Sequence, residues 1–241
     1  MFTRILNAIA RRMGQELVLT APLAADESRI IELASPCTMT GKHRLLGLMD
    51  AVRYVCKAGI AGDIVECGVW KGGSMMAAAA TLLAEGDTSR NLYLFDTFEG
   101  MAPPTVRDRD NEGNRAATMH AQIPKWCYAG IEEVKRNLLS TGYPAERLHF
   151  IPGKVEDTLP HASLGSIALL RLDTDWYEST RAELMHLFPL LVERGVLIVD
   201  DYGHWQGARE AVDEYFREHP EYPLLLQRTD YTARMAVKVR R

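Results

Sequence analysis

The sequence predicts an α/β protein built around a mostly parallel, doubly wound sheet. Short apolar runs rich in β-branched and aromatic residues alternate repeatedly with longer helix-forming segments. The chain has 241 residues, of which 47% are hydrophobic and 25% charged, and this suits one domain with a full core. Acidic residues also gather where the apolar runs end, at Glu66, Asp96, Asp173 and Asp200. In an open parallel sheet, ligands bind outside the carboxyl ends of the strands, so this pattern predicts a site there.

The first half of the alternation extends from residue 63 to residue 153. Strands are predicted over 63–69, 91–98 and 148–153, where the apolar runs are short. Helices are predicted from the glycine turn to about Glu85, in an alanine-rich segment, and over 128–140. The polar stretch 99–125 shows neither pattern, and loops of that length are typically lids or disordered. We therefore predict that 99–125 is a lid.

The second half continues the same alternation. Strands are predicted over 166–173 and 195–201, and helices over 179–193 and 207–219. Two final apolar runs, 222–228 and 233–239, predict an antiparallel hairpin that turns near Thr229–Thr232.

Residues 1–60 look helical and lack the alternation. We interpret them as a helical N-terminal cap or oligomer arm of the same domain as residues 61–241, which makes a homo-oligomer the expected assembly. The opening segment 1–14 is amphipathic and basic, but its apolar stretch is short. This favours a packing or subunit-contact helix over a cleaved signal or a membrane anchor.

The composition argues against several classes of partner. The net charge is −4 and the isoelectric point is about 6.0, which does not favour nucleic acid. No apolar run approaches the ~20 residues that a transmembrane helix needs. The four cysteines show neither CxxC pairing nor zinc-site spacing, which indicates reduced thiols in a cytoplasmic protein.

The turn after the first predicted strand reads VECGVWKGGSM. Its glycines let the backbone approach a ligand closely, although their spacing differs from the G-x-G-x-x-G of dinucleotide sites. Glu66 suits a cationic or amine-bearing ligand better than a pyrophosphate, and Asp96 at the next strand end is placed to accept hydrogen bonds from ribose hydroxyls. A glycine turn alone is also an ordinary tight connection, but this combination favours an adenosyl ligand.

A second acidic group consists of Asp173, Asp175, Asp200 and Asp201. Carboxylate oxygens suit hard cations such as magnesium, calcium or manganese, and no His/Cys set accompanies them to indicate zinc. Adjacent like charges near a core also need a compensating cation. The alternative is helix N-capping, but four acids exceed what two caps need. On a regular strand Asp173 and Asp175 would share one face, and the lone His204 is more typical of a surface or substrate-facing residue.

Several segments together resemble one known family. VECGVWKGGSM, LFDTFEGM, LDTDWYEST and VLIVDDYG are similar to motifs of the macrocin/mycinamicin O-methyltransferases, which are S-adenosylmethionine- and magnesium-dependent sugar methyltransferases of natural-product pathways. SPCTMTGKHRLLGLMDAVRYV and IPGKVEDTLP extend the resemblance over about residues 30–205. It implies a Rossmann-like class I S-adenosylmethionine-dependent methyltransferase fold.

The resemblance also implies roles for individual residues. Cofactor binding is implied for Glu66, Gly68, Gly72, Ser74, Asp96, Gly153, Lys154 and Glu156. Metal binding, by Mg²⁺ or Mn²⁺, is implied for Asp173, Asp200 and Asp201, and Asp175 matches a proposed general base beside the catalytic ligand Asp173. The family often has glycine where this chain has Thr174, which is expected to narrow the pocket and leave the ligands intact.

The expected function is therefore methyl transfer to a hydroxyl of a small-molecule or glycoside acceptor, preferably a vicinal-diol sugar that chelates the metal. An alternative acceptor is a catechol or other phenolic diol, on which Trp126, Trp176 and Tyr177 would stack. More remote alternatives are a non-catalytic adenosyl-ligand sensor or scaffold, which would leave four carboxylates at a cost without a role, and a metal-dependent phosphohydrolase, which would not need Glu66 and Asp96.

Overall fold

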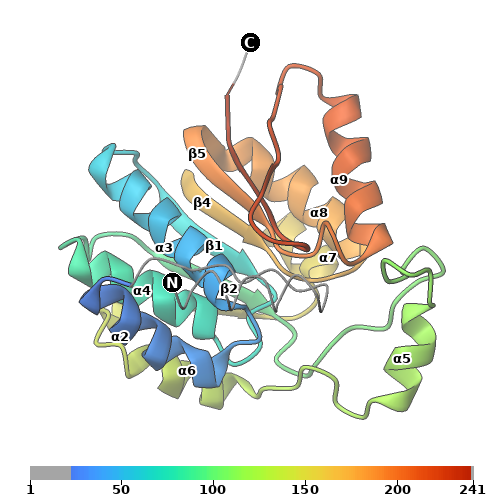
Figure 1. Ribbon diagram of the computed structural model, residues 1–241, viewed down its shortest axis with the longest axis horizontal. Coiled ribbons are helices and arrows are strands. Elements are labelled where there is room, and N and C mark those ends of the chain that lie inside the picture. The colour runs from blue at the N-terminus through green and yellow to red at the C-terminus, as the bar shows by residue number, and fades with distance from the viewer. Residues whose placement is uncertain (1–22, 240–241) are drawn as a thin grey trace, which may run out of the picture.

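The computed structural model describes residues 23–239, and their strands form a single mixed sheet between two layers of helices (Figure 1). The strands are β1 Asp63–Cys67, β2 Leu92–Asp96, β3 Leu148–Pro152, β4 Ile167–Leu172, β5 Leu191–Val199, β6 Gln227–Arg228 and β7 Arg234–Val237. Their order across the sheet is β3-β2-β1-β4-β5-β7-β6. The first five strands are parallel to one another, whereas β7 lies antiparallel to β5 and to β6.

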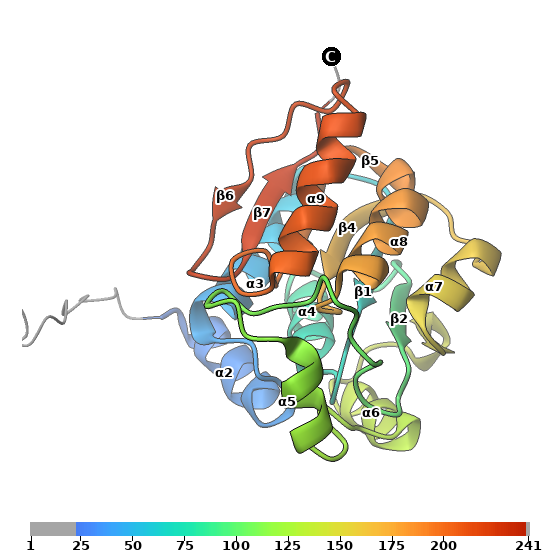
Figure 2. The same ribbon diagram turned by 90° about the vertical axis from the view of Figure 1, so that its right-hand side faces the viewer.

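The helices cover both faces of this sheet. They are α2 Ala25–Ala34, α3 Lys42–Lys57, α4 Gly73–Ala84, α5 Ala116–Gln122, α6 Ile131–Leu139, α7 Val155–Thr158, α8 Tyr177–Leu187 and α9 Gln206–Glu218. On one face α3, α4 and α6 pack, with α2 outside against α4, and on the other face lie α7, α8 and α9 (Figures 1 and 2). The predicted α/β architecture with a closing antiparallel hairpin is confirmed.

Alternating side chains of the central strands pack into two separate hydrophobic cores, one on each face of the sheet. In β4, Leu169 packs into the core beneath α3 and α4, whereas its neighbour Leu170 packs into the core beneath α8 and α9. Every residue of β4 and the last five residues of β5 are buried, and apart from Arg171 in β4 these segments are apolar or glycine. The strand order reverses between β1 and β4, since the chain builds outward through β2 and β3 and then returns to add β4 and β5. Such a switch point opens a crevice at the carboxyl ends of the strands.

Two predicted elements have wrong boundaries, and two short helices were not predicted. The helix expected over 179–193 ends at Leu187, because Pro189 turns the chain into a short 3₁₀ segment and β5 already begins at Leu191. The strand expected over 222–228 is reduced to Gln227–Arg228. The segment 99–125 contains the helix α5, and the four-residue α7 was also not predicted.

The segment 99–125 is tied to the helices on one side of the crevice. Asp108 is 1% exposed, and its carboxylate accepts hydrogen bonds from the backbone N–H of Tyr177 at the start of α8 (2.8 Å) and of Thr105 (2.6 Å). The N–H of Gln206 at the start of α9 donates to the carbonyl of Arg109 at 2.8 Å. One carboxylate thus satisfies a free helix N–H and fixes the segment beside α8.

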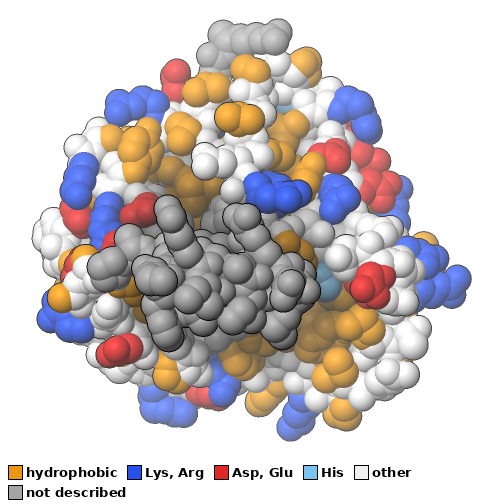
Figure 3. Space-filling model, in the orientation of Figure 1, with side chains coloured by type: hydrophobic (Ala, Val, Ile, Leu, Met, Phe, Trp, Pro, Cys, Tyr) orange, Lys and Arg blue, Asp and Glu red, His pale blue; other side chains and the backbone are white. Residues whose placement is uncertain are grey.

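The N-terminal part of the described chain is helical, as expected, and α2 and α3 pack on α4. The amphipathic helix expected over residues 1–14 lies outside the described residues, and the oligomer-arm role of residues 1–60 stays a prediction. Among residues 23–239, no helix combines the length and the apolar character needed to cross a membrane. The four cysteines are all unpaired, and charges of both signs are interspersed around the face seen in Figure 3.

Candidate functional site

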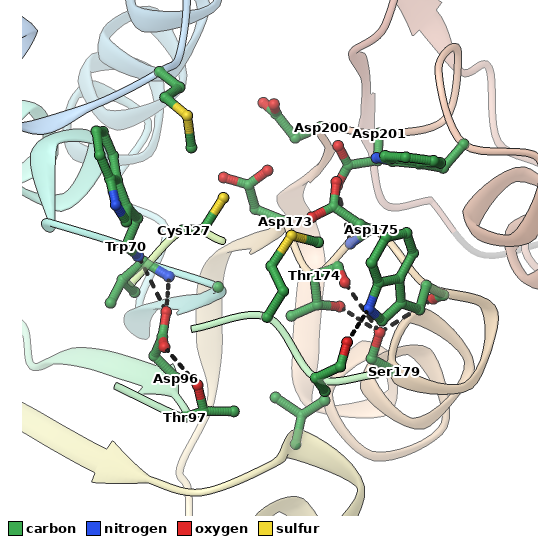
Figure 4. A pocket seen from close by; sticks show the side chains of 18 of the residues that line it. Trp70, Asp96, Thr97, Cys127, Asp173, Thr174, Asp175, Ser179, Asp200 and Asp201 are labelled. Atoms are coloured by element: carbon green, nitrogen blue, oxygen red, sulfur yellow. Dashed lines mark hydrogen bonds between the residues drawn. The ribbon is translucent and has the colours of Figure 1, made fainter. Parts of the chain in front are cut away.

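A cleft of about 420 Å³ opens at the carboxyl ends of the parallel strands. Of the residues predicted to bind the cofactor or the metal or to act as the base, ten line it: Gly68, Ser74, Asp96, Gly153, Lys154, Glu156, Asp173, Asp175, Asp200 and Asp201. In Figure 4, Asp96 and Trp70 lie on one side of this space and Asp200 and Asp201 on the other. The cleft therefore joins the glycine turn and the acidic group in one cavity.

Asp96 braces the turn that follows β1. Its Oδ2 accepts the backbone N–H groups of Val69 (2.7 Å) and Trp70 (3.0 Å), and its Oδ1 accepts the N–H of Phe98 (2.7 Å). Trp70 adopts a positive φ of 46°, which is uncommon for a bulky residue and depends on such anchoring. Asp96 thus determines the shape of the turn as well as lining the cleft.

Gly68 allows the turn to approach the strand end that carries Asp173. Its φ is 79°, and a Cβ on Gly68 would collide with the backbone carbonyl of Asp173. Gly72, the residue before α4, packs instead against Leu138 and does not line the cleft. Its effect on a ligand would be indirect.

Gly68→Ala is expected to lower stability by more than the ~1–2 kcal/mol that a left-handed conformation costs an L-residue. The extra loss comes from the collision with the Asp173 backbone. Urea unfolding measures it. Gly86→Ala is the matched control, because Gly86 has a φ of 75° and open space around its Cβ position. Equal losses of unfolding free energy in the two variants would mean that the turn relaxes to remove the collision at no cost.

Three of the four aspartates come together. Asp173, Asp200 and Asp201 each offer a carboxylate oxygen, and these oxygens lie within 4.8 Å of one another. Asp173 follows β4, and the adjacent pair follows β5. All-oxygen donors at this spacing fit a hard divalent cation. The helix-capping alternative is not realised, since Trp176 and Trp205 occupy the cap positions of α8 and α9.

Asp175 stands apart from these three. The prediction that Asp173 and Asp175 share a strand face is wrong, because β4 ends at Leu172 and Asp175 adopts a φ of 68°. The N–H of Asp175 donates to Asp201 Oδ2 at 3.3 Å. Burial and the nearby charge of Asp173 raise the pKa of Asp175 to about 7, although hydrogen bonds from Asp201 and Trp205 act in the opposite direction.

Arg171 is the compensating cation, and the sequence reading missed it. The register of β1 and β4 pairs Glu66 with Arg171, and the two side chains form a fully buried ion pair. The guanidinium also reaches Asp173 Oδ2 (2.5 Å) and Asp200 Oδ1 (2.7 Å). A charged residue inside the apolar run ALLRL was the available signal, because such a residue is rarely buried unless paired.

Glu66 lies behind the cleft and is not among its lining residues. Burial raises the pKa of Glu66 to about 7, although the Arg171 charge acts in the opposite direction. Its Oε2 has no hydrogen-bond partner. Glu66 is therefore connected to the cleft through its ion pair with Arg171.

An aromatic wall closes the side of the cleft near the aspartates. Its members are Trp126, Trp176 and Trp205, with ring centroids 4.9 to 6.2 Å apart. The indole N–H of Trp176 donates to the carbonyl of Ala102, so the segment 99–125 holds the wall in place. Tyr177, which was expected to stack on an acceptor, is not among the lining residues, and its hydroxyl donates to Glu214 at 2.5 Å.

Thr174 lines the cleft, but its hydroxyl is engaged away from the aspartates. Thr174 Oγ1 lies within hydrogen-bond distance of Ser179 Oγ (2.8 Å, Figure 4) and of Glu183 Oε1 (2.8 Å). Burial raises the pKa of the Glu183 carboxyl well above its usual range. The threonine therefore fixes the loop that carries Asp173 and Asp175.

Comparison with known sequences places this site in a family context. A family model described as macrocin-O-methyltransferase (TylF) matches residues 22–236. The 8-demethyl-8-(2,3-dimethoxy-alpha-L-rhamnosyl)-tetracenomycin-C 4'-O-methyltransferase of Streptomyces olivaceus is 39% identical over 178 residues, which span 74% of this chain and 67% of that protein. The demethyldecarbamoylnovobiocin O-methyltransferase of Streptomyces niveus is 36% identical over 182 residues, spanning 76% and 68%.

Comparison with solved structures agrees. The O-methyltransferase NovP superposes with a TM-score of 0.74 at 32% identity, covering 85% of this chain and 83% of NovP. The calicheamicin methyltransferase CalS11 superposes with a TM-score of 0.57 at 20% identity over 93% and 97%, a likeness of fold alone. The fold is that of the class I S-adenosylmethionine-dependent methyltransferases, and the chain belongs to the macrocin O-methyltransferase family.

Proposed function

We propose that this O-methyltransferase transfers the methyl group of S-adenosylmethionine to a hydroxyl of a sugar on a glycosylated natural product, in a reaction that needs a divalent cation. The observation that carries the proposal is the single cleft that joins the glycine turn to the aspartate cluster. Relatives whose names specify a rhamnosyl-tetracenomycin and mycinamicin III support a glycosylated acceptor.

The cofactor would occupy the side of the cleft near the turn. Gly68 and Ser74 would face its methionine part, and Asp96 its ribose. Gly153, Lys154 and Glu156, which follow β3, would lie around the adenine. The bound cofactor supplies an electrophilic methyl group on a sulfonium, so the chain has to align an oxygen nucleophile with it.

Asp173, Asp200 and Asp201 would hold Mg²⁺ or Mn²⁺, and their clustered oxygens fit that role. When bound, the cation would supply Lewis acidity that lowers the pKa of an acceptor hydroxyl, and two vicinal hydroxyls would suit it best. Asp175 lines the same cleft and would accept the hydroxyl proton on its carboxylate. The tryptophan wall and the start of the segment 99–125 would exclude water from the reacting groups.

The test is a methyl-transfer assay with purified protein, S-adenosylmethionine and a panel of glycosides and catechols. We expect methylation of a glycoside, loss of activity in excess EDTA, and recovery on adding Mg²⁺ or Mn²⁺. S-adenosylhomocysteine should also raise the melting temperature, because a ligand that binds only the folded state stabilises it. Full turnover in EDTA by protein shown to be metal-free would rule out the metal requirement.

A catechol or other phenolic diol is the second candidate acceptor. Trp126 and Trp176 line the cleft and offer ring faces or edges to an aromatic substrate. Tryptophan rings would also pack against the apolar faces of sugars, so the assay with glycosides and catechols has to distinguish the two acceptors. Methylation of catechols alone would select this second candidate.

A further inference from the structure

Asp200 is the proposed metal ligand with the most crowded carboxylate. Its Oδ1 accepts the Nη2–H of Arg171 at 2.7 Å, and its Oδ2 forms an ion pair with Nη1 of Arg44. The Asp200 side chain is only 4% exposed. Both carboxylate oxygens of Asp200 are therefore already paired with a guanidinium group.

The two arginines differ in how firmly they are held. Arg171 is 3% exposed, belongs to β4, and is bonded to Glu66, Asp173 and Thr40 in addition to Asp200. Arg44 is 18% exposed, belongs to α3, and lines the cleft. Releasing Arg44 from Asp200 leaves the buried network intact, whereas releasing Arg171 would leave carboxylates uncompensated.

Arg44 also has a second partner within reach. Its Nε lies 3.1 Å from Oδ2 of Asp230, in the turn between β6 and β7, in an ion pair that has no hydrogen bond. The other oxygen of Asp230 accepts the N–H groups of Thr232 and Ala233, so this carboxylate is fixed. Arg44 can leave Asp200 and keep an ion pair.

We propose that Arg44 is a built-in competitor of the divalent cation, which holds Asp200 in the metal-free enzyme and retreats onto Asp230 when the metal binds. This inference rests on the proposed function, since it takes Asp200 as a metal ligand. The physical reason is Coulombic: a guanidinium against a ligand carboxylate offsets its charge and repels an incoming cation. Arg44 thereby lowers the metal affinity of the site.

The test measures Mn²⁺ binding to the full-length, metal-free protein by the loss of the free-ion EPR signal, and Mg²⁺ binding by calorimetry. Arg44→Gln is expected to tighten binding of both ions by about tenfold, because one positive charge near the site is removed. Arg53→Gln is the matched control on the same helix, since Arg53 pairs with Asp26 and Glu27 away from the cleft. It should leave the affinity unchanged.

Asp230→Asn is expected to weaken metal binding, whereas Arg44→Gln is expected to tighten it. Without Asp230, Arg44 has no carboxylate to pair with once the metal displaces it from Asp200. The affinity for the metal should therefore fall by about tenfold. In the double variant with Arg44→Gln this loss should largely disappear, because the arginine through which Asp230 acts is absent. A loss of equal size in both backgrounds would show that Asp230 acts directly on the ion, and would overturn its role as a partner of Arg44.

The outcomes separate this inference from the proposed function. If the wild type binds Mn²⁺ and Arg44→Gln binds it equally or more weakly, the competition is refuted and the metal site stands. If neither protein binds Mn²⁺ or Mg²⁺ at millimolar concentration, the metal site and the inference both fall. Circular dichroism checks folding, and should Arg44→Gln fail to fold, an unchanged affinity in Asp230→Asn overturns the inference.

Discussion

Asp175→Asn is expected to lower kcat by about 10²–10⁴-fold, the usual loss when a general base is removed. Asparagine keeps the shape of the side chain and tolerates the left-handed backbone that Asp175 adopts, with its φ of 68°. The change therefore removes the proton acceptor without disturbing the loop. Steady-state kinetics with an acceptor that the wild type methylates measures the effect, and calorimetry should find the metal affinity nearly unchanged.

Asp173→Asn is the matched comparison two residues away. Asp173 belongs to the oxygen cluster, so replacing its carboxylate with the amide of asparagine should weaken metal binding. Added Mg²⁺ should then partly restore activity. Rescue of Asp175→Asn by Mg²⁺ would instead identify Asp175 as a ligand. The base would then lie elsewhere, and His204, which lines the same cleft and whose Nδ1 lies 3.3 Å from the hydroxyl oxygen of Tyr231, is the next candidate.

The order of the elements could be predicted because the central strands are mostly apolar runs, and because longer helices follow β1, β2 and β4. The boundaries failed where local chemistry overrides that pattern. Pro189 ends a helix that its apolar neighbours would continue, and the run before Gln227 pairs with no strand although its residues favour one. The helix α5 is short and lies in a polar segment, so periodicity gave no signal for it.

The acids of the site could be predicted because each follows a strand, and parallel strands bring their ends together. The arginines that compensate these acids could not be predicted. Arg171 reaches Glu66 through the pairing of β1 with β4, and Arg44 reaches Asp200 from a helix 156 residues earlier in the chain. Such contacts depend on register and on helix placement, which a single sequence does not reveal. The sequence therefore indicated that a cation compensates the acids, but it did not indicate which residue supplies the charge.

The expected effect of Arg171→Met on the metal-free enzyme is a loss of about 3–5 kcal/mol of unfolding free energy, because a broken buried ion pair leaves an uncompensated charge. Methionine fills similar volume, so a cavity adds little. Urea unfolding in EDTA measures the loss. Arg181→Met is the control, since Arg181 pairs with Glu214 and Glu218 near the surface and should cost at most about 1 kcal/mol.

The same variant should show a pH dependence of known sign. Burial raises the pKa of Glu66 from 4.5 to about 7 even with Arg171 present, so the folded protein binds more protons than the unfolded chain between these values. Stability therefore falls as the pH rises through this range. Without Arg171 the folded-state pKa rises further, and the deficit of Arg171→Met should grow from pH 5.5 to pH 8. An equal deficit at both pH values would mean that Arg171 stabilises the fold through packing, because only lost charge compensation depends on the ionisation of Glu66.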